Sequence, residues 1–290
     1  MPDEKKPVFS PSFTKAYDFC PVKARLERSL GLAPAIADKG LYSRIAGSAF
    51  HAGAAVLHRY LYDIKVITID AIIEAQEAAL QVYQGQFKAY REANGAILES
   101  DYQKALDSVL KTLPKYAKET PVKHWAKVRG VEQEFPNHGR CRLDLWGDDA
   151  QGIPVIVDLK FVIQLDSWRI PQRMNDYSFD WALSHYAWAA FEEGITGTVG
   201  ILLVIGAPFT IQYRWWGVPD MQKWLKQAQA KWARMEATKD TPLEELEQPT
   251  VHANQYGTCW LKRWCLEMQM QGSLPSDIIQ VKWPRNVGVE

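Results

Sequence analysis

Two acidic residues and a lysine occur in two short segments that have the residue types of β-strands. The segments are residues 141–146 (CRLDLW) and 155–160 (VIVDLK). Successive side chains of a strand point to opposite faces, so the alternation predicts that Asp158 and Lys160 share one face. It also predicts that Asp144 points away from Leu143 and Leu145. Acids on neighbouring strands can converge, and we expect Asp144 and Asp158 to meet at one site.

Such a pair of carboxylates could bind a divalent cation. Hard cations such as Mg²⁺ prefer carboxylate oxygens and keep water ligands, so Asp144 and Asp158 could hold a metal that activates water and neutralises a phosphate. Lys160 could position that water or stabilise the developing negative charge. The alternative is an ordinary ion pair of little energetic value. The apolar residues around Asp158 favour a metal site, because they predict a central strand, in which an unused charge is costly.

Five short motifs follow one another along the chain. They are S-x-S…C-P within residues 10–21, G-x-x-x-H at residues 47–51, L-D at residues 143–144, D-x-K at residues 158–160 and LSHYAWA at residues 183–189. In this order they make the chain resemble the PD-(D/E)XK nuclease superfamily over about residues 9–265. The resemblance is closest to the RecB-like branch, which includes AddB-type nucleases and CRISPR-adaptation exonucleases.

The resemblance implies which residues form the active site. His51, Asp144 and Asp158 would be ligands of Mg²⁺ or Mn²⁺, and both acids would be catalytic. Lys160 would be the catalytic lysine, and Tyr186 the aromatic anchor of the last motif. These roles imply a restriction-endonuclease-like core.

Three positions require comment beside the family pattern. Family members can supply an accessory acid from the strand before the first acid, and here Glu132 and Glu134 are both candidates on one face of that strand. Ala182 stands where the last motif has Gln, which puts the DNA contact of that motif in doubt. Cys141 stands where a Gly often precedes the first acid, and it is interpreted as a packing change.

The cysteines extend the same resemblance. Some RecB-like members hold an iron–sulfur cluster between an early Cys and a late group of cysteines, and Cys20, Cys259 and Cys265 fit that spacing. Tyr256 stands where a further late cysteine is expected. Four thiolates normally hold such a cluster, and Cys141 lies in a strand away from this junction. We therefore favour an apolar version of the junction, with a bound cluster as the alternative.

The predicted elements that must position these groups form an α/β fold, a mixed central β-sheet flanked by helices with a helical N-terminal insertion. Helical spacing predicts helices over residues 12–30, 43–62, 71–92, 100–118, 180–193 and 219–237. Alternation and turn signals predict strands over residues 128–135, 140–146, 153–161, 197–205 and 209–216. We expect three regions: residues 1–126, helical and carrying the G-x-x-x-H motif; residues 127–240, the nuclease core; and residues 241–290, packing back on the first helix.

The charge balance restricts how DNA could bind. The 34 basic residues equal the 34 acidic ones, so any path for DNA must be a local patch. Trp168, Arg169 and Arg173 follow the D-x-K strand in a predicted loop, where stacking and positive charge suit a single strand. The chain has no run of about 18 apolar residues, and its charged first residues lack a secretory signal, so we expect a cytoplasmic protein without a membrane partner.

Together these features predict a metal-dependent DNA nuclease. We favour an exonuclease that acts on single-stranded DNA or duplex ends in DNA processing, recombination or repair. The alternative is a nuclease-fold module that binds DNA or protein with weak or no catalysis, suggested by the departures at Ala182 and Tyr256. A hydrolase for small phosphorylated substrates is disfavoured, because nothing resembles a glycine-rich loop that cradles phosphates.

Overall fold

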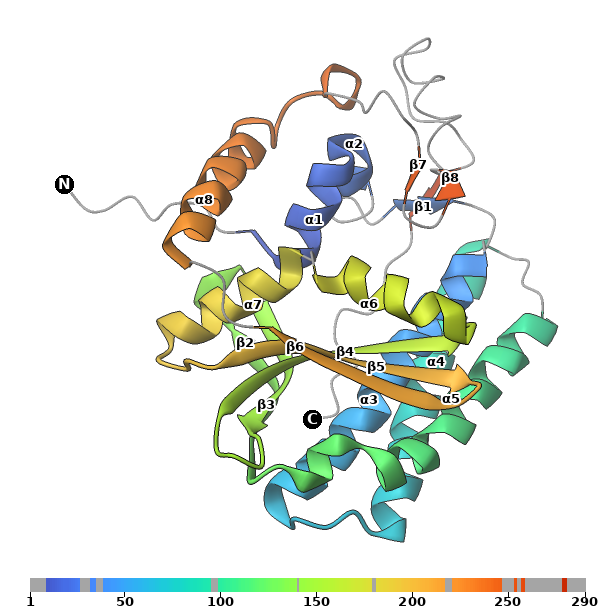
Figure 1. Cartoon of the computed structure of the whole chain (residues 1–290). Coiled ribbons are helices and arrows are strands. Elements are labelled where there is room, and N and C mark those ends of the chain that lie inside the picture. The colour runs from blue at the N-terminus through green and yellow to red at the C-terminus, as the bar shows by residue number, and fades with distance from the viewer. Residues whose placement is uncertain are drawn as a thin grey trace.

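Five strands form one mixed sheet in the computed structural model of this chain (Figure 1). Their order across the sheet is β2 (Lys127–Phe135), β3 (Cys141–Asp148), β4 (Pro154–Gln164), β5 (Thr198–Ala207) and β6 (Thr210–Trp216). Only β4 and β5 are parallel within this sheet. The predicted fold class, a mixed sheet flanked by helices, is therefore confirmed. The structure describes residues 9–26, 32–34, 39–94, 99–139, 141–178, 181–216, 221–246, 253–254, 257–258 and 278–280.

Strand β4 is the central strand, as the sequence predicts. It lies between the antiparallel β3 and the parallel β5. Val155, Ile156, Val157 and Leu159 are all buried. A strand covered on both faces needs a continuous apolar run instead of alternation. The charged residues Asp158 and Lys160 follow that run near the middle of the strand.

Three long helices cover one face of the sheet. They are α3 (Lys39–Asp63), α4 (Ile69–Asn94) and α5 (Glu99–Glu119). Their small and aromatic residues pack with Leu145, Val157 and Leu159 in one cluster. Gly53 permits α3 to approach α4 closely, because a Cβ there would lie 2.7 Å from the carbonyl oxygen of Ala75. Packing in this cluster sets the distance between α3 and strands β3 and β4, and so it positions the side chains of α3 relative to the sheet.

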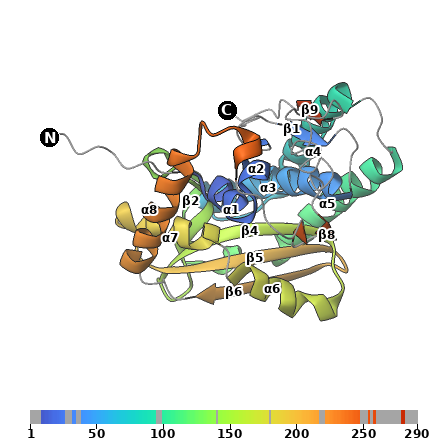
Figure 2. The same cartoon turned by 90° about the horizontal axis from the view of Figure 1, so that it is seen from above.

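The other face carries helices from both ends of the described chain. They are α6 (Ile170–Ser178), α7 (Trp181–Glu192) and α8 (Met221–Ala237), with α1 (Pro11–Phe19) and α2 (Pro21–Ala24) packed beside them. Tyr17, Trp188, Trp224 and Trp232 form the core of this layer. Figure 2 shows α1 beside α7 and α8. Helix α1 thus packs with α7 and α8.

Two expectations are wrong at prolines. The helix predicted over residues 12–30 is interrupted, because Cys20 is extended (φ −162°) before Pro21 starts α2. A residue before proline is disfavoured in the helical region. The loop predicted after the D-x-K strand is a 3₁₀ turn followed by α6, in which Pro171 occupies the first turn. Proline is well tolerated there, since the first-turn N–H groups have no helical partner.

Short elements complete the described chain. They are η2 (Pro121–His124), η3 (Pro136–His138), η4 (Ser167–Arg169), η5 (Leu243–Glu245), β1 (Leu32–Pro34), β7 (Ala253–Asn254), β8 (Gly257–Thr258) and β9 (Ile278–Gln280). β1 pairs with β9 in an antiparallel ladder. A segment near the C-terminus therefore returns to the N-terminal region. Tyr256, Cys259 and Cys265 lie outside the described residues, so the cluster prediction is not addressed there.

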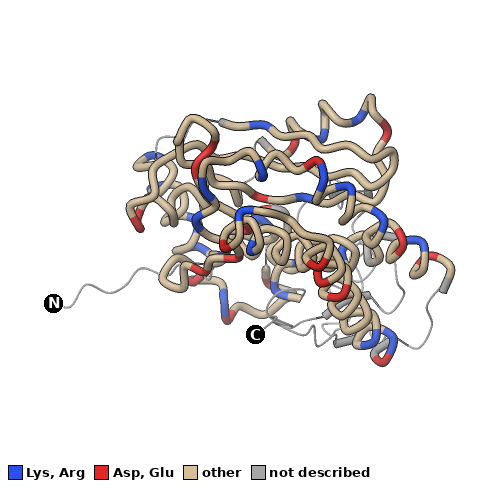
Figure 3. Tube along the Cα trace, turned by 90° about the horizontal axis from the view of Figure 1, so that it is seen from below, with Lys and Arg blue, Asp and Glu red and all other residues tan. Residues whose placement is uncertain are grey.

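The surface carries charges of both signs. Figure 3 shows basic and acidic positions interspersed over the α3–α5 side, seen from below. Because the charges are interspersed, any attraction for a polyanion must arise at particular clefts.

No described helix combines the length and the apolar character needed to cross a bilayer.

Candidate metal centre

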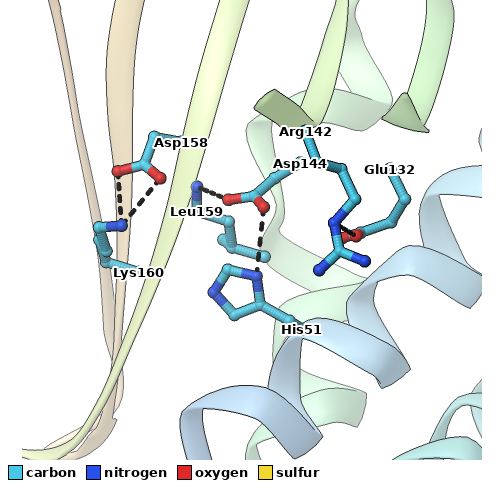
Figure 4. Close-up of polar contacts among 7 residues, drawn as sticks. All are labelled: His51, Glu132, Arg142, Asp144, Asp158, Leu159 and Lys160. Atoms are coloured by element: carbon cyan, nitrogen blue, oxygen red, sulfur yellow. Dashed lines mark hydrogen bonds and ion pairs between the residues drawn. The ribbon is translucent and has the colours of Figure 1, made fainter. Parts of the chain in front are cut away.

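Helix α3 and strand β3 bring His51 and Asp144 together (Figure 4). His51 Nδ1 lies 3.5 Å from Asp144 Oδ1. Burial acts to lower the pKa of His51, but the charges of Asp144 and Glu132 outweigh it, and the pKa is raised. Burial acts to raise the pKa of Asp144, but His51, Lys160 and the Leu159 N–H hold it below the usual value. In the absence of a cation the pair therefore favours the charged forms, a carboxylate beside an imidazolium.

Glu132 completes a group of three ligand-bearing side chains. Single ligand atoms of His51, Glu132 and Asp144 all lie within 4.8 Å of one another. Arg142 Nε contacts Glu132 Oε2 at 2.9 Å. Burial and the nearby Asp144 raise the pKa of Glu132. Glu134, the other accessory acid left open by the sequence, is exposed and not part of this group.

A break in the β2–β3 ladder directs Asp144 towards α3. Glu132 lies across from Asp144, between the pairs Val131–Leu145 and Gln133–Leu143, and has a left-handed φ of 51°. Leu143 packs on the α7 side, whereas Leu145 packs in the α3 cluster. Strict alternation would place both leucines on one face, so the predicted alternation is wrong at this point. Irregularities of this kind re-aim side chains.

The backbone of β4 holds Asp144 in the new direction. The Leu159 N–H donates a 2.8 Å hydrogen bond to Asp144 Oδ2. The β3–β4 ladder begins at the pair Leu145–Val157, so residue 144 lies just outside it. Asp144 Oδ1 is thereby left to face His51.

Asp158 and Lys160 form a close pair on one side of β4, as predicted. Lys160 Nζ lies 2.8 Å from Asp158 Oδ1 and 2.7 Å from Oδ2. Figure 4 shows this pair on one side of β4 and His51 with Asp144 on the other. The expected meeting of Asp158 with His51 and Asp144 is therefore not present in this structure. The ladder break explains the difference, because it turns Asp144 towards α3 while Asp158 keeps regular alternation.

A buried histidine lies on the same helix as His51. His58 Nε2 is 2.7 Å from the hydroxyl oxygen of Tyr116, and its side chain is 1% exposed. Burial lowers the pKa of His58 to about 3, so the ring is neutral at ordinary pH. The hydrogen bond between His58 and Tyr116 connects α3 to α5. Our sequence interpretation missed it, although the spacing of seven residues from His51 places both rings on one side of a helix.

The remaining predicted residues lie elsewhere. Tyr186 packs against apolar clusters between α7 and the sheet. Trp168 is 75% exposed, with Arg169 Cζ 5.1 Å from its ring centre. Arg173 Cζ lies 5.1 Å from the ring centre of Tyr177. The structure thus keeps Trp168 available for stacking, apart from the His51 group.

The donor set fits a divalent cation. One imidazole and two carboxylates suit Mn²⁺, and the carboxylates suit Mg²⁺ with water completing the shell. Two carboxylates within 4.8 Å repel each other unless a proton or cation lies between them. The raised pKa of Glu132 reflects that repulsion together with burial. The residues that would hold the cation are His51, Glu132 and Asp144.

Comparison with known families supports this interpretation. Residues 8–266 match the family model described as the PD-(D/E)XK nuclease superfamily. The matched range includes the sheet, α3 and every residue of the metal group. A search of curated proteins found no match.

Proposed function

The chain belongs to the PD-(D/E)XK nuclease superfamily, and from that membership we propose a Mg²⁺- or Mn²⁺-dependent deoxyribonuclease of the RecB-like type. It hydrolyses phosphodiester bonds as an exonuclease in DNA recombination or repair. The main observation that supports this proposal is the group of His51, Glu132 and Asp144. A lysine–aspartate pair lies on the adjoining strand. Membership of the superfamily implies nuclease chemistry, a divalent metal and a nucleic-acid substrate.

Each residue of the site has a role in hydrolysis. A bound divalent cation supplies Lewis acidity towards a phosphate oxygen and towards water. The Leu159 N–H orients Asp144 so that Oδ1 serves as a ligand beside His51. Lys160, which contacts Asp158, stabilises the negative charge that develops on the phosphate. In the balanced reaction, water adds to phosphorus, the bond to the leaving oxygen breaks, and that oxygen takes up a proton.

Asp158 has two roles in the proposal. It neutralises Lys160 in the present arrangement, since both carboxylate oxygens contact Nζ. The family motif implies that Asp158 would be a further acidic ligand of a bound cation. Lys160 would then be available to the phosphate. The D-x-K motif brings the acid and the base to one face for this purpose.

Trp168, Arg169 and Arg173 are proposed to guide a DNA strand. The exposed indole of Trp168 with its neighbouring guanidinium supports base stacking. Tyr186 supports the same region from α7. The pairing of β1 with β9 supports packing of residues 241–290 against the N-terminal region, and the iron–sulfur alternative for Cys20, Cys259 and Cys265 stays open.

A second candidate is a nuclease-fold module that binds DNA without cleaving it. The separation of Asp158 from the His51 group favours this alternative, because one acidic ligand is already engaged by Lys160. The two candidates predict opposite results when DNA and metal are supplied together.

Incubation of end-labelled single- and double-stranded DNA with Mg²⁺, Mn²⁺ or EDTA tests the proposal. We expect short products from the DNA ends with either metal and none with EDTA. Asp144→Asn should reduce the rate by about a hundredfold or more, since it removes a ligand charge while its carbonyl still accepts the Leu159 N–H. Asp70→Asn, an exposed change on α4, is the matched control. Metal-dependent cleavage at the wild-type rate by Asp144→Asn would refute the site, and DNA binding without cleavage by the wild type would favour the binding module.

A further inference from the structure

A cleft of about 390 Å³ lies beside the candidate metal centre, between the end of α3 and β2. Its lining includes Arg59, Tyr62, Asp63, Arg129, Gly130 and Gln133. Neither the family motifs nor the catalytic proposal uses any of these side chains. Arginine and tyrosine together are a common combination for binding nucleotides.

The α3 residues that line the cleft lie further along the same helix than His51. Arg59 and Tyr62 follow His51 by eight and eleven residues, so they recur along one side of α3. The axial distance from His51 to Arg59 is about 12 Å at 1.5 Å per residue. A strand bound at the metal could therefore extend into this cleft.

Two arginines, Arg59 and Arg129, line the cleft, and the charge of Arg129 is balanced by Asp148. Arg129 Nε donates to both oxygens of Asp148, at 2.9 and 2.8 Å, and Nη2 lies 2.7 Å from Oδ2. These contacts orient Arg129 and leave Nη1 out of the pairing. Arg59 makes no hydrogen bond or ion pair within the described part of the chain. Asp63 also lines the cleft and offsets part of the positive charge.

Gly130 and Gln133 of β2 line the cleft, and residue 130 is a glycine because the Trp146 indole packs against it. A Cβ at Gly130 would lie 2.2 Å from Trp146 Nε1 and 2.5 Å from Gln133 Oε1. The Trp146 N–H donates to Gln133 Oε1 and closes the floor. Tyr62 is 45% exposed at the rim, so a face of its ring is accessible. The shape therefore suits a planar group above Tyr62 with an anion beyond it.

We propose that this cleft binds one nucleotide of the substrate strand, with its phosphate between Arg59 and Arg129 and its base stacked on Tyr62. The inference rests on the proposed function for the direction of the strand. A B-form strand rises 3.4 Å per nucleotide and a stretched one rises more, so the bound nucleotide lies about two to four positions from the cleaved bond.

Fluorescence anisotropy with a labelled single strand of about twelve nucleotides, in EDTA, tests the cleft separately from catalysis. Arg59→Gln should weaken binding about tenfold and reduce the slope of log K against log [salt] by about 0.7, the value for one phosphate contact. Tyr62→Ala should weaken binding about tenfold with the slope unchanged, because stacking carries no charge. Asp63→Asn should instead strengthen binding, because it removes a negative charge from the cleft.

The control is Arg91→Gln, which removes an exposed arginine of α4 and should leave the affinity unchanged. Circular dichroism melts establish that each variant is folded. Wild-type affinity and salt slope in both Arg59→Gln and Tyr62→Ala would overturn the proposal, and so would a wild-type protein that binds no single strand. A wild-type protein that binds through this cleft but cleaves nothing with Mg²⁺ or Mn²⁺ refutes the proposed function and leaves the cleft supported.

Discussion

A carboxylate oxygen of Glu132 lies within 4.8 Å of a carboxylate oxygen of Asp144, and Glu132 adopts a φ of 51° at that point. Left-handed backbone is uncommon for residues other than glycine and costs on the order of 1 kcal/mol or more. Glycine would occupy the position without that cost. Glu132 therefore lowers the stability of the fold but places a carboxylate beside Asp144. A residue that is kept at such a cost is typical of a functional site.

Glu132→Gly should be more stable than Glu132→Gln by about 1 kcal/mol, because only the glycine relieves the backbone strain. Both variants lose the ion pair with Arg142, so their comparison isolates the backbone. Urea denaturation in EDTA measures the difference. Both should also bind Mn²⁺ about tenfold or more weakly by calorimetry, since each lacks one ligand charge. Equal stability of the two variants would show that the φ of Glu132 is not strained.

Removing the Lys160 charge should destabilise the protein more than removing the Asp158 charge. Asp158 is 2% exposed, so Lys160→Met leaves a buried carboxylate without that ammonium and should cost about 3 kcal/mol. Asp158→Asn should cost less, and the double variant less than the sum of the two. Chemical denaturation gives these free energies. Each variant should also lose metal-dependent cleavage.

The exposed pair of Lys111 and Asp107 on α5 provides the comparison. Their side chains are 76% and 43% exposed. Lys111→Met should change the free energy of unfolding by less than about 0.5 kcal/mol. Additive costs for Asp158→Asn and Lys160→Met would mean that the two residues are not coupled.

Two glycines of α3 should respond oppositely to alanine. Gly53→Ala places a Cβ 2.7 Å from the Ala75 carbonyl oxygen and should destabilise the fold by about 1–3 kcal/mol. Gly47→Ala meets no described atom within 4 Å and should be neutral or stabilising by up to about 1 kcal/mol. Thermal melts distinguish them. Gly53→Ala should also weaken Mn²⁺ binding, because it displaces the helix that carries His51; a Gly53→Ala protein as stable as the wild type would contradict the packing argument.

Stability should fall as the pH is lowered from 6.5 towards 4. Burial lowers the pKa of His58 to about 3 and that of His185 to about 4, from an ordinary value of 6.5. In this window the unfolded chain binds more protons than the folded chain, so the free energy of unfolding rises with pH. Each histidine contributes a slope of up to about 1.4 kcal/mol per pH unit.

His58→Gln should reduce this slope, since glutamine keeps a polar contact for Tyr116 but does not titrate. Urea midpoints at several pH values between about 4 and 7 measure it. The matched change is His124→Gln, at an exposed histidine of η2. An unchanged slope in His58→Gln, or a reduced one in His124→Gln, would contradict the assignment.

Most of the core could be predicted from hydrophobic patterns. The apolar run around Asp158 identified the central strand, and the predicted range 128–135 differs from β2 by one residue. Period-two patterns and turn residues report local backbone, which is why the five strands of the sheet could be located along the chain. The pairing of Asp158 with Lys160 follows from the same alternation.

The orientation of Asp144 could not be predicted in this way. Alternation assumes an uninterrupted ladder. Left-handed backbone is usually indicated by Gly or Asn, but residue 132, across from Asp144, is a glutamate. The choice of Glu132 over Glu134 depends on the same local break. The contact of His58 with Tyr116 joins residues far apart in the chain, which no local pattern contains.

The separation of His51 from Asp144 along the chain affects the newly made protein. The helix that carries His51 leaves the ribosome before β3 is synthesised, and 93 positions separate the two residues. A chain that stops between these two residues contains His51 but not Asp144, the residue whose carboxylate the His51 ring contacts. Translation products that stop before residue 144 therefore lack Asp144 and cannot assemble the candidate metal centre of His51, Glu132 and Asp144.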